Sequence, residues 1–160
     1  MKMRKRCMVV FGLVLLLCSN TVYGARLRRR IDEFGEMILL KTDRNPMDFN
    51  GYGNWCGFGG KGGTVDDIDA CCKAHDECYE RINDGSCETL LKYKIYTTEY
   101  RWSFKNGNIV CHDDDTCAKQ LCECDHAASI CFGKYQAEYN TQNKHNGIIK
   151  GLSRLVGLNG

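Results

Sequence analysis

The chain has 160 residues, of which 43% are hydrophobic and 26% charged, and its formal net charge is +2. This length predicts one domain with processing segments and excludes a two-domain protein. Eight of the 22 Lys and Arg residues, and none of the Asp and Glu residues, lie in the first 30 positions. A chain that starts at Ile31 therefore has 14 basic and 20 acidic residues, a net charge of −6, which argues against nucleic acid as a partner.

The first 24 residues have the pattern of a secretory signal peptide. Residues 1–6 carry four basic side chains, and an apolar run of about a dozen residues follows before the small Gly24. This run is shorter than the ~20 residues that span a bilayer, so we expect a secreted, extracellular protein. Residues 25–30 are rich in arginine, which predicts a propeptide removed before Ile31. A basic arm that stays attached is the alternative.

Ten cysteines remain after the predicted signal peptide is removed. An even number in an exported chain implies five disulfides and no free thiol. Zinc ligation is the rival interpretation, but the chain has no pair of Cys-x-x-Cys knuckles and the expected compartment is oxidising. The spacing of ten cysteines does not by itself select one pairing.

The stretch from Ile31 to Leu40 has the spacing of a short amphipathic helix, with Phe34 and Ile38 on one side. Asn45-Pro46 interrupts this pattern. Residues 50–63 contain seven glycines, which predicts a loop.

A second helix is expected over residues 66–79 and somewhat beyond, and it contains the sequence CCKAHDECY. On this helix Cys71, His75 and Tyr79 share one face, and Asp76 lies on an adjacent face. A His-Asp pair alone is most often an ordinary surface feature. Here disulfides on both sides would fix a potential general base beside a potential metal-binding carboxylate, so we favour a catalytic site.

Residues 96–111 change to an alternating pattern, and Asn106-Gly107 supplies a tight turn, which predicts a small β-hairpin. Asp113–Asp115 then open a second long helix through about Phe132. We expect a small, mainly α, disulfide-rich fold with two long antiparallel disulfide-linked helices, an N-terminal helix, a loop and the hairpin. Its core is too small to be stable without the disulfides.

Three motifs, in order, resemble the secreted phospholipase A2 family over about residues 34–132. They are similar to the family's calcium loop (YGNWCGFGG, residues 52–60), its active-site helix (DDIDACCKAHDECY, residues 66–79) and its second helix (CECD, residues 122–125). The resemblance implies calcium-dependent hydrolysis of the sn-2 ester of glycerophospholipids at a phospholipid membrane or micelle surface. It also suggests an invertebrate member, and we expect a monomer.

By this resemblance, the backbone carbonyls of Trp55, Gly57 and Gly59 would bind Ca²⁺ together with the carboxylate of Asp76. His75 would deprotonate a water that attacks the ester carbonyl, without a serine nucleophile or an acyl-enzyme. Calcium and the Gly57 N–H would stabilise the oxyanion. The family usually has tyrosine at the position of Trp55, but a main-chain ligand survives this change.

Asp125 would accept a hydrogen bond from the other imidazole nitrogen of His75, and Tyr79 and Tyr100 would donate to Asp125. A simple surface acid is the alternative for Asp125, and the place of Tyr100 depends on the hairpin register. The residues that would line an acyl-chain channel, or else belong to the plain core, are Ile31, Phe34, Ile38, Phe49 and Phe132.

The disulfide pairing is also taken from the resemblance, after removal of two family bridges that Asn54 and Phe104 cannot form. It is Cys56–Cys72, Cys71–Cys131, Cys78–Cys124, Cys87–Cys117 and Cys111–Cys122.

The alternative function is a non-catalytic toxin or receptor-binding protein on the same scaffold. Such relatives typically lose the residue that corresponds to His75 or Asp76, and this chain has both. The domain is expected to end at residue 138, because residues 139–160 match nothing in the family pattern. Within them GIIKGLSRLVGL (residues 147–158) has an apolar helical stripe, which indicates either an interfacial helix or a tail that is packed on the body or disordered in water.

Overall fold

The computed structural model describes residues 33–87, 94–96 and 98–145. The predicted signal peptide and propeptide, the channel candidate Ile31 and residues 147–158 lie outside this part of the chain. In the described residues no helix is long and apolar enough to cross a membrane.

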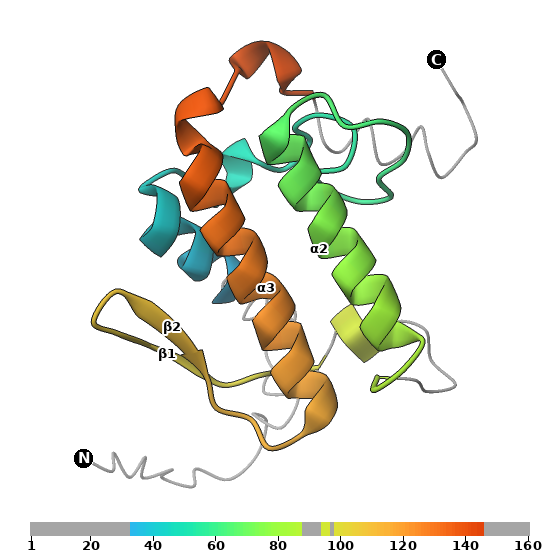
Figure 1. Ribbon diagram of the computed structural model, residues 1–160, viewed down its shortest axis with the longest axis vertical. Helices are drawn as coiled ribbons and strands as arrows, with labels where there is room; N and C mark the ends of the chain where they lie inside the picture. Colours follow the sequence, from blue (N-terminus) through green and yellow to red (C-terminus); the bar gives the residue numbers. More distant parts are fainter. Residues whose placement is uncertain (1–32, 88–93, 97, 146–160) are drawn as a thin grey trace, which may run out of the picture.

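Two long helices, α2 (Asp67–Asn83) and α3 (Thr116–Tyr135), form the body of the molecule and lie side by side in opposite directions (Figure 1). Residues 33–42 form a helix ahead of them, and a 3-10 turn, η1 (Pro46–Asp48), leads into the glycine-rich loop. The mainly helical, disulfide-rich fold expected from the sequence is confirmed.

Aspartates cap both long helices. The side chain of Asp66 accepts from the Asp69 N–H at the start of α2, and that of Asp115 accepts from the Ala118 N–H at the start of α3. α3 therefore begins at Thr116, later than the sequence suggests, because Asp113 instead accepts from the backbone and side chain of Arg101.

The hairpin pairs β1 (Trp102–Lys105) with β2 (Asn108–Cys111) in antiparallel register around Asn106-Gly107. Both turn residues have positive φ, as a two-residue turn of type I′ requires. β1 is shorter than the alternation from residue 98 suggests. Before β1 the chain enters the core, where Tyr100 is buried. β2 ends at Cys111, which is bonded to Cys122 of α3.

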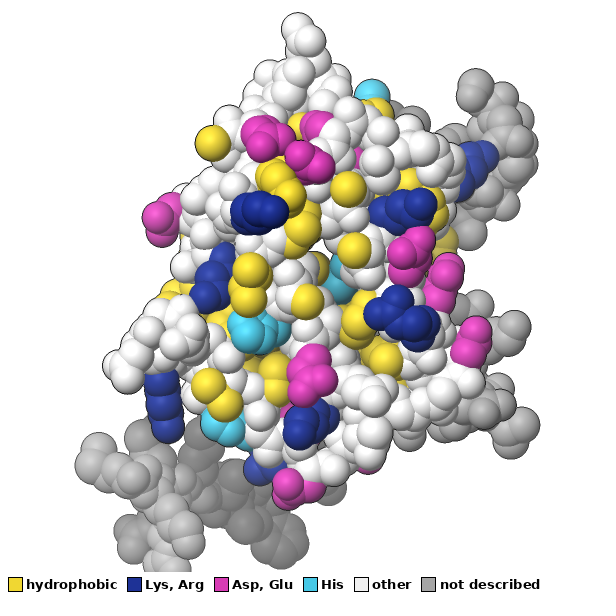
Figure 2. Space-filling view, viewed as in Figure 1, with side chains coloured by type: hydrophobic (Ala, Val, Ile, Leu, Met, Phe, Trp, Pro, Cys, Tyr) yellow, Lys and Arg dark blue, Asp and Glu magenta, His cyan; other side chains and the backbone are white. Residues whose placement is uncertain are grey.

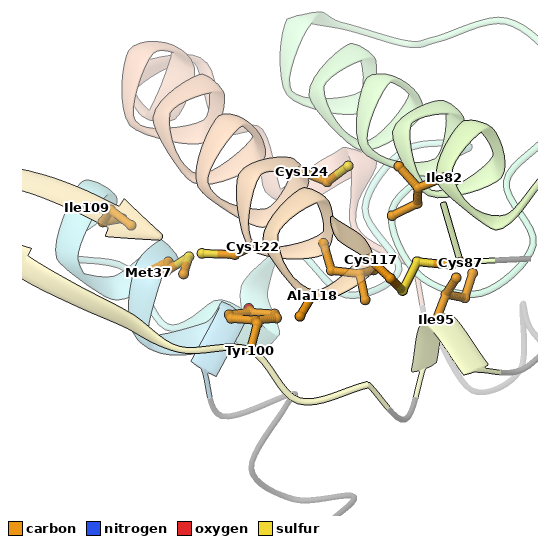
Figure 3. Close-up of a cluster of buried hydrophobic side chains, with 11 residues drawn as sticks. Met37, Ile82, Cys87, Ile95, Tyr100, Ile109, Cys117, Ala118, Cys122 and Cys124 are labelled. Carbon is orange, nitrogen blue, oxygen red and sulfur yellow. A yellow bond between two sulfur atoms is a disulfide. The ribbon is translucent and has the colours of Figure 1, made fainter. Parts of the chain in front are cut away.

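In the described part of the chain, the core consists of two clusters of buried side chains. Figure 3 shows the first, in which Met37, Tyr100 and Ile109 pack against cysteines and Ala118 of α3. The second lies nearer the glycine-rich loop and includes Ile38, Phe49 and Phe132. Phe49 stacks on Phe132 with ring centroids 4.5 Å apart. Three of the channel candidates thus lie together in one cluster.

Candidate active site

His75 and Asp125 face each other from the two long helices. The His75 Nε2 lies 2.7 Å from Asp125 Oδ1. The imidazole is also stacked on Phe34 at 4.7 Å and contacts the ring of Tyr79 at 4.4 Å. A bond to an ionised carboxylate requires the proton on Nε2, so Nδ1 of the neutral ring carries the lone pair. This arrangement leaves Nδ1 as the atom that can take a proton.

Asp125 is a fully buried hydrogen-bond acceptor, which contradicts the interpretation as a surface acid. Besides His75, Tyr79 OH donates to its Oδ1 at 2.7 Å and Tyr100 OH donates to its Oδ2 at 2.5 Å. Burial and the Asp125 charge raise the pKa of Tyr100 far above its usual value, so this hydroxyl remains a donor. The structure thus brings together all four residues that the sequence placed in this network.

Two disulfides flank the His75–Asp125 pair. They join Cys71 to Cys131 and Cys78 to Cys124, four residues before and three after His75 on α2. The structure forms five disulfides, which are the same pairs that the family resemblance implies: Cys56–Cys72, Cys71–Cys131, Cys78–Cys124, Cys87–Cys117 and Cys111–Cys122. All ten cysteines of the described chain are therefore oxidised, which excludes their use as zinc ligands.

Asp69 anchors the glycine-rich loop from the first turn of α2. Its buried carboxylate accepts the N–H groups of Asn54 at 2.8 Å, Trp55 at 2.7 Å and Val65 at 3.0 Å. Asp69 was not predicted as a site residue, because an acid in a first helical turn also fits a simple helix-dipole role. Gly53 is required beside it. Its φ is +52°, and a Cβ there would lie 2.2 Å from Asp69 Cγ.

A disulfide places the loop against the helix face that carries Asp76. Cys56 of the loop is bonded to Cys72, with their Cα atoms 5.0 Å apart, and Asp76 lies one turn further along α2. The ring of Trp55 lies near the same helix, with Lys73 Nζ 5.4 Å from its centroid. The residues predicted to bind a metal therefore lie on neighbouring elements.

The loop and Asp76 together offer the oxygen donors that Ca²⁺ prefers. The carbonyls of Asn54 and Cys56 accept bonds within the loop, from Lys61 N–H at 3.4 Å and Gly51 N–H at 3.0 Å. This pattern fits an alternation along the loop. The carbonyls of residues 54 and 56 bind loop amides, and those of residues 55, 57 and 59 are the expected metal ligands. In the described residues no three His, Cys, Asp or Glu side chains cluster as a metal site, so a metal here would rely on backbone carbonyls.

Residues 139–145, which were expected to belong to a C-terminal tail of unknown role, also contact the loop. Asn143 O accepts the Gly53 N–H at 2.8 Å, and Gly51 O accepts the His145 N–H at 2.9 Å. These residues belong to the folded body, and no sequence pattern pointed to their contacts.

The architecture is that of a small protein with a His–Asp pair between disulfide-linked helices, beside a loop rich in oxygen donors. The sequence model that describes the phospholipase A2 family matches residues 31–144. The chain belongs to this family, as expected from its sequence.

Similar proteins come from a centipede and from vipers. Phospholipase A2 SSD387 of Scolopendra dehaani is 37% identical over 122 residues, which cover 76% of this chain and 81% of that protein. Acidic phospholipase A2 VP8 of Daboia palaestinae is 42% identical, covering 69% and 74%. The acidic phospholipase A2 homolog vipoxin A chain of Vipera ammodytes meridionalis is 41% identical, covering 72% and 89%.

Proposed function

We propose that this protein is a secreted, calcium-dependent phospholipase A2 that cleaves the sn-2 ester of glycerophospholipids into a fatty acid and a lysophospholipid. The bond between His75 Nε2 and the buried Asp125, beside the disulfide-anchored loop, is the observation that carries this proposal. Family membership and the names of the similar proteins support it.

His75 would act as the general base. Asp125 holds the Nε2 proton and keeps the ring in the tautomer with a basic Nδ1. A water molecule at Nδ1 would lose a proton as its oxygen attacks the ester carbonyl. The charge of Asp125 would stabilise the imidazolium, which then returns the proton to the leaving alkoxide. Tyr79 and Tyr100 would keep Asp125 in place throughout.

The carbonyls of Trp55, Gly57 and Gly59 and the carboxylate of Asp76 would hold the metal. Bound calcium would supply positive charge to the ester oxygen as it becomes an oxyanion. The Gly57 N–H would donate to the same oxygen. Phe34 covers one face of the imidazole and would keep bulk water from it when an acyl chain enters.

The proposed partner is a phospholipid membrane or micelle surface. Met47, Phe58 and Val65, within or beside the glycine-rich loop, are large apolar side chains with 58%, 60% and 48% of their surface exposed. Basic and acidic side chains are interspersed on the face shown in Figure 2, without a single-sign patch of the kind that nucleic-acid binding favours. The exposure of these apolar side chains therefore supports the proposed binding to a lipid surface.

Calcium removal provides the direct test. Phosphatidylcholine vesicles labelled in the sn-2 chain should release fatty acid with calcium, lose this release in EGTA and recover it when calcium is added in excess. Vesicles labelled only in the sn-1 chain are the control and should release no labelled fatty acid. A well-folded protein without sn-2 release under any condition would instead support the non-catalytic toxin or receptor-binding alternative.

The apolar stripe of residues 147–158 leads to a separate proposal, that this segment helps to hold the enzyme on lipid. Truncation after Asn146 should reduce vesicle binding and hydrolysis of packed lipid, while hydrolysis of monomeric short-chain lecithin is unchanged. The truncation keeps residues 139–145 and their contacts with the loop. Equal loss on both substrates would show that the segment supports the fold, and no loss on either would exclude a membrane role.

A further inference from the structure

Residues 139–145, here called the strap, lie along the first part of the glycine-rich loop. Figure 1 shows the chain after α3 turning back over the loop that precedes α2. Tyr52 and Lys144 form an antiparallel bridge, and main-chain bonds join Gly53 to Asn143 and His145 to Gly51. The strap therefore pairs with the loop as a short second strand would.

The side chain of Lys144 joins the strap to the chain that enters the loop. Its ammonium group has three protons, and it donates to three backbone carbonyls, those of Met47, Asp48 at 2.8 Å and Asn50 at 2.6 Å. Charged donors make stronger hydrogen bonds than neutral ones, and this side chain is partly buried. One side chain thus fixes three nearby points of the chain that enters the loop.

Side chains hold the strap to two further elements. Tyr139 OH donates to the carbonyl of Asp48 at 2.9 Å, and its ring packs on Tyr52 at 4.9 Å. Asn143 Nδ2 donates to Asp66 Oδ2 at 2.8 Å, the same oxygen that accepts from Tyr52 OH. Because Asp66 caps α2, the strap, the loop and the start of α2 share one network.

Gly51 and Tyr52, in the part of the loop that pairs with the strap, are hydrogen-bonded to Cys56. Gly51 N–H donates to Cys56 O at 3.0 Å, and Cys56 N–H donates to Tyr52 O at 3.2 Å. Asn50 Oδ1 lies close to Gly57, within 2.9 Å of where a Cβ would be. Since Cys56 lies between Trp55 and Gly57, a shift of residues 50–52 would move the carbonyls on both sides.

We propose that Lys144 is a positioning residue that holds the loop in the conformation able to bind calcium. This inference rests on the calcium site of the proposed function. Without the three bonds of Lys144, a smaller fraction of molecules has the competent loop. The measured dissociation constant rises in inverse proportion to that fraction.

The test compares Lys144→Met, which keeps the length of the side chain and removes its donors, with Lys119→Met, an exposed lysine of α3. Calorimetry with calcium should give a dissociation constant raised about ten-fold in Lys144→Met and unchanged in Lys119→Met. In the calcium-free protein, the amides of Gly51 and Gly53 should exchange hydrogen about ten-fold faster in Lys144→Met. The amide of Leu121 should exchange at the parent rate.

The direction of the change in calcium affinity distinguishes a positioning role of Lys144 from a direct electrostatic effect of its charge. Removing a positive charge near a cation site would by itself tighten calcium binding, so weaker binding supports the positioning role. Parent-like affinity and exchange in Lys144→Met would overturn it. If Lys144→Met fails to fold, the test uses Tyr139→Phe, which loses the bond from its hydroxyl to Asp48. A smaller rise in the calcium dissociation constant would support the proposal, and an unchanged constant would overturn it.

The same measurements give a different result if the proposed function itself is wrong. A parent protein that binds no calcium refutes the proposed site and, with it, the calcium role of Lys144. Faster amide exchange in the calcium-free Lys144→Met protein would then still show that the strap holds the loop.

Discussion

Replacing His75 with glutamine should abolish ester hydrolysis and leave the fold intact. The amide of glutamine can still donate to Asp125 but has no basic nitrogen, and none of the five disulfides is touched. Because general-base catalysis contributes typically 10²–10⁴-fold, we expect sn-2 fatty acid release to fall by at least about a thousand-fold. Release from phosphatidylcholine vesicles, with circular dichroism as a check of the fold, measures this.

A matched control is His112→Gln, because His112 is an exposed histidine whose ring Nε2 lies 2.6 Å from Ser103 Oγ. It should keep parent activity. Calcium affinity should remain at the parent value in His75→Gln, since the loop and Asp76 are unchanged. Substantial hydrolysis by His75→Gln would refute the general-base mechanism.

Replacing Asp76 with lysine should abolish calcium binding and turnover together. The substitution removes the carboxylate ligand and places an ammonium where the metal would lie. We expect no calorimetric signal at millimolar calcium and fatty acid release no higher than that of parent protein in EGTA.

Glu77→Lys is the matched control for this charge reversal, because Glu77 is the next residue of α2, is exposed and pairs with Lys73 at 3.8 Å. Its calcium affinity should stay within about three-fold of the parent value, since solvent and salt screen an exposed charge. Equal loss of affinity in both variants would assign the effect to general electrostatics and contradict Asp76 as a ligand.

Much of the fold could be predicted because its signals are local. The helical period of residues 66–79, the acidic start of α3 and the Asn106-Gly107 turn each specify an element without knowledge of the rest. The exact ends could not be predicted. Three consecutive aspartates can each cap a helix, and only their neighbours in space determine that Asp115 does so while Asp113 binds Arg101.

The candidate site could be predicted where side chains act on side chains. His75, Asp125 and the two tyrosines were placed by the resemblance, and the structure gives their distances. Asp69 and Lys144 were missed, because both act on backbone groups of a loop whose path no local pattern specifies. A carboxylate or ammonium directed at main-chain atoms has no sequence signature of its own.

The two disulfides that flank His75 also set a property of the unfolded chain. In each bridge the two residue numbers add to the same value, so both link α2 and α3 in a single antiparallel register. A chain that loses its helices with these bridges intact keeps His75 and Asp125 on short tethers, at a high effective concentration for each other. Heat inactivation without reduction should therefore be reversible on cooling, whereas unfolding in a reducing solution separates the base from its carboxylate.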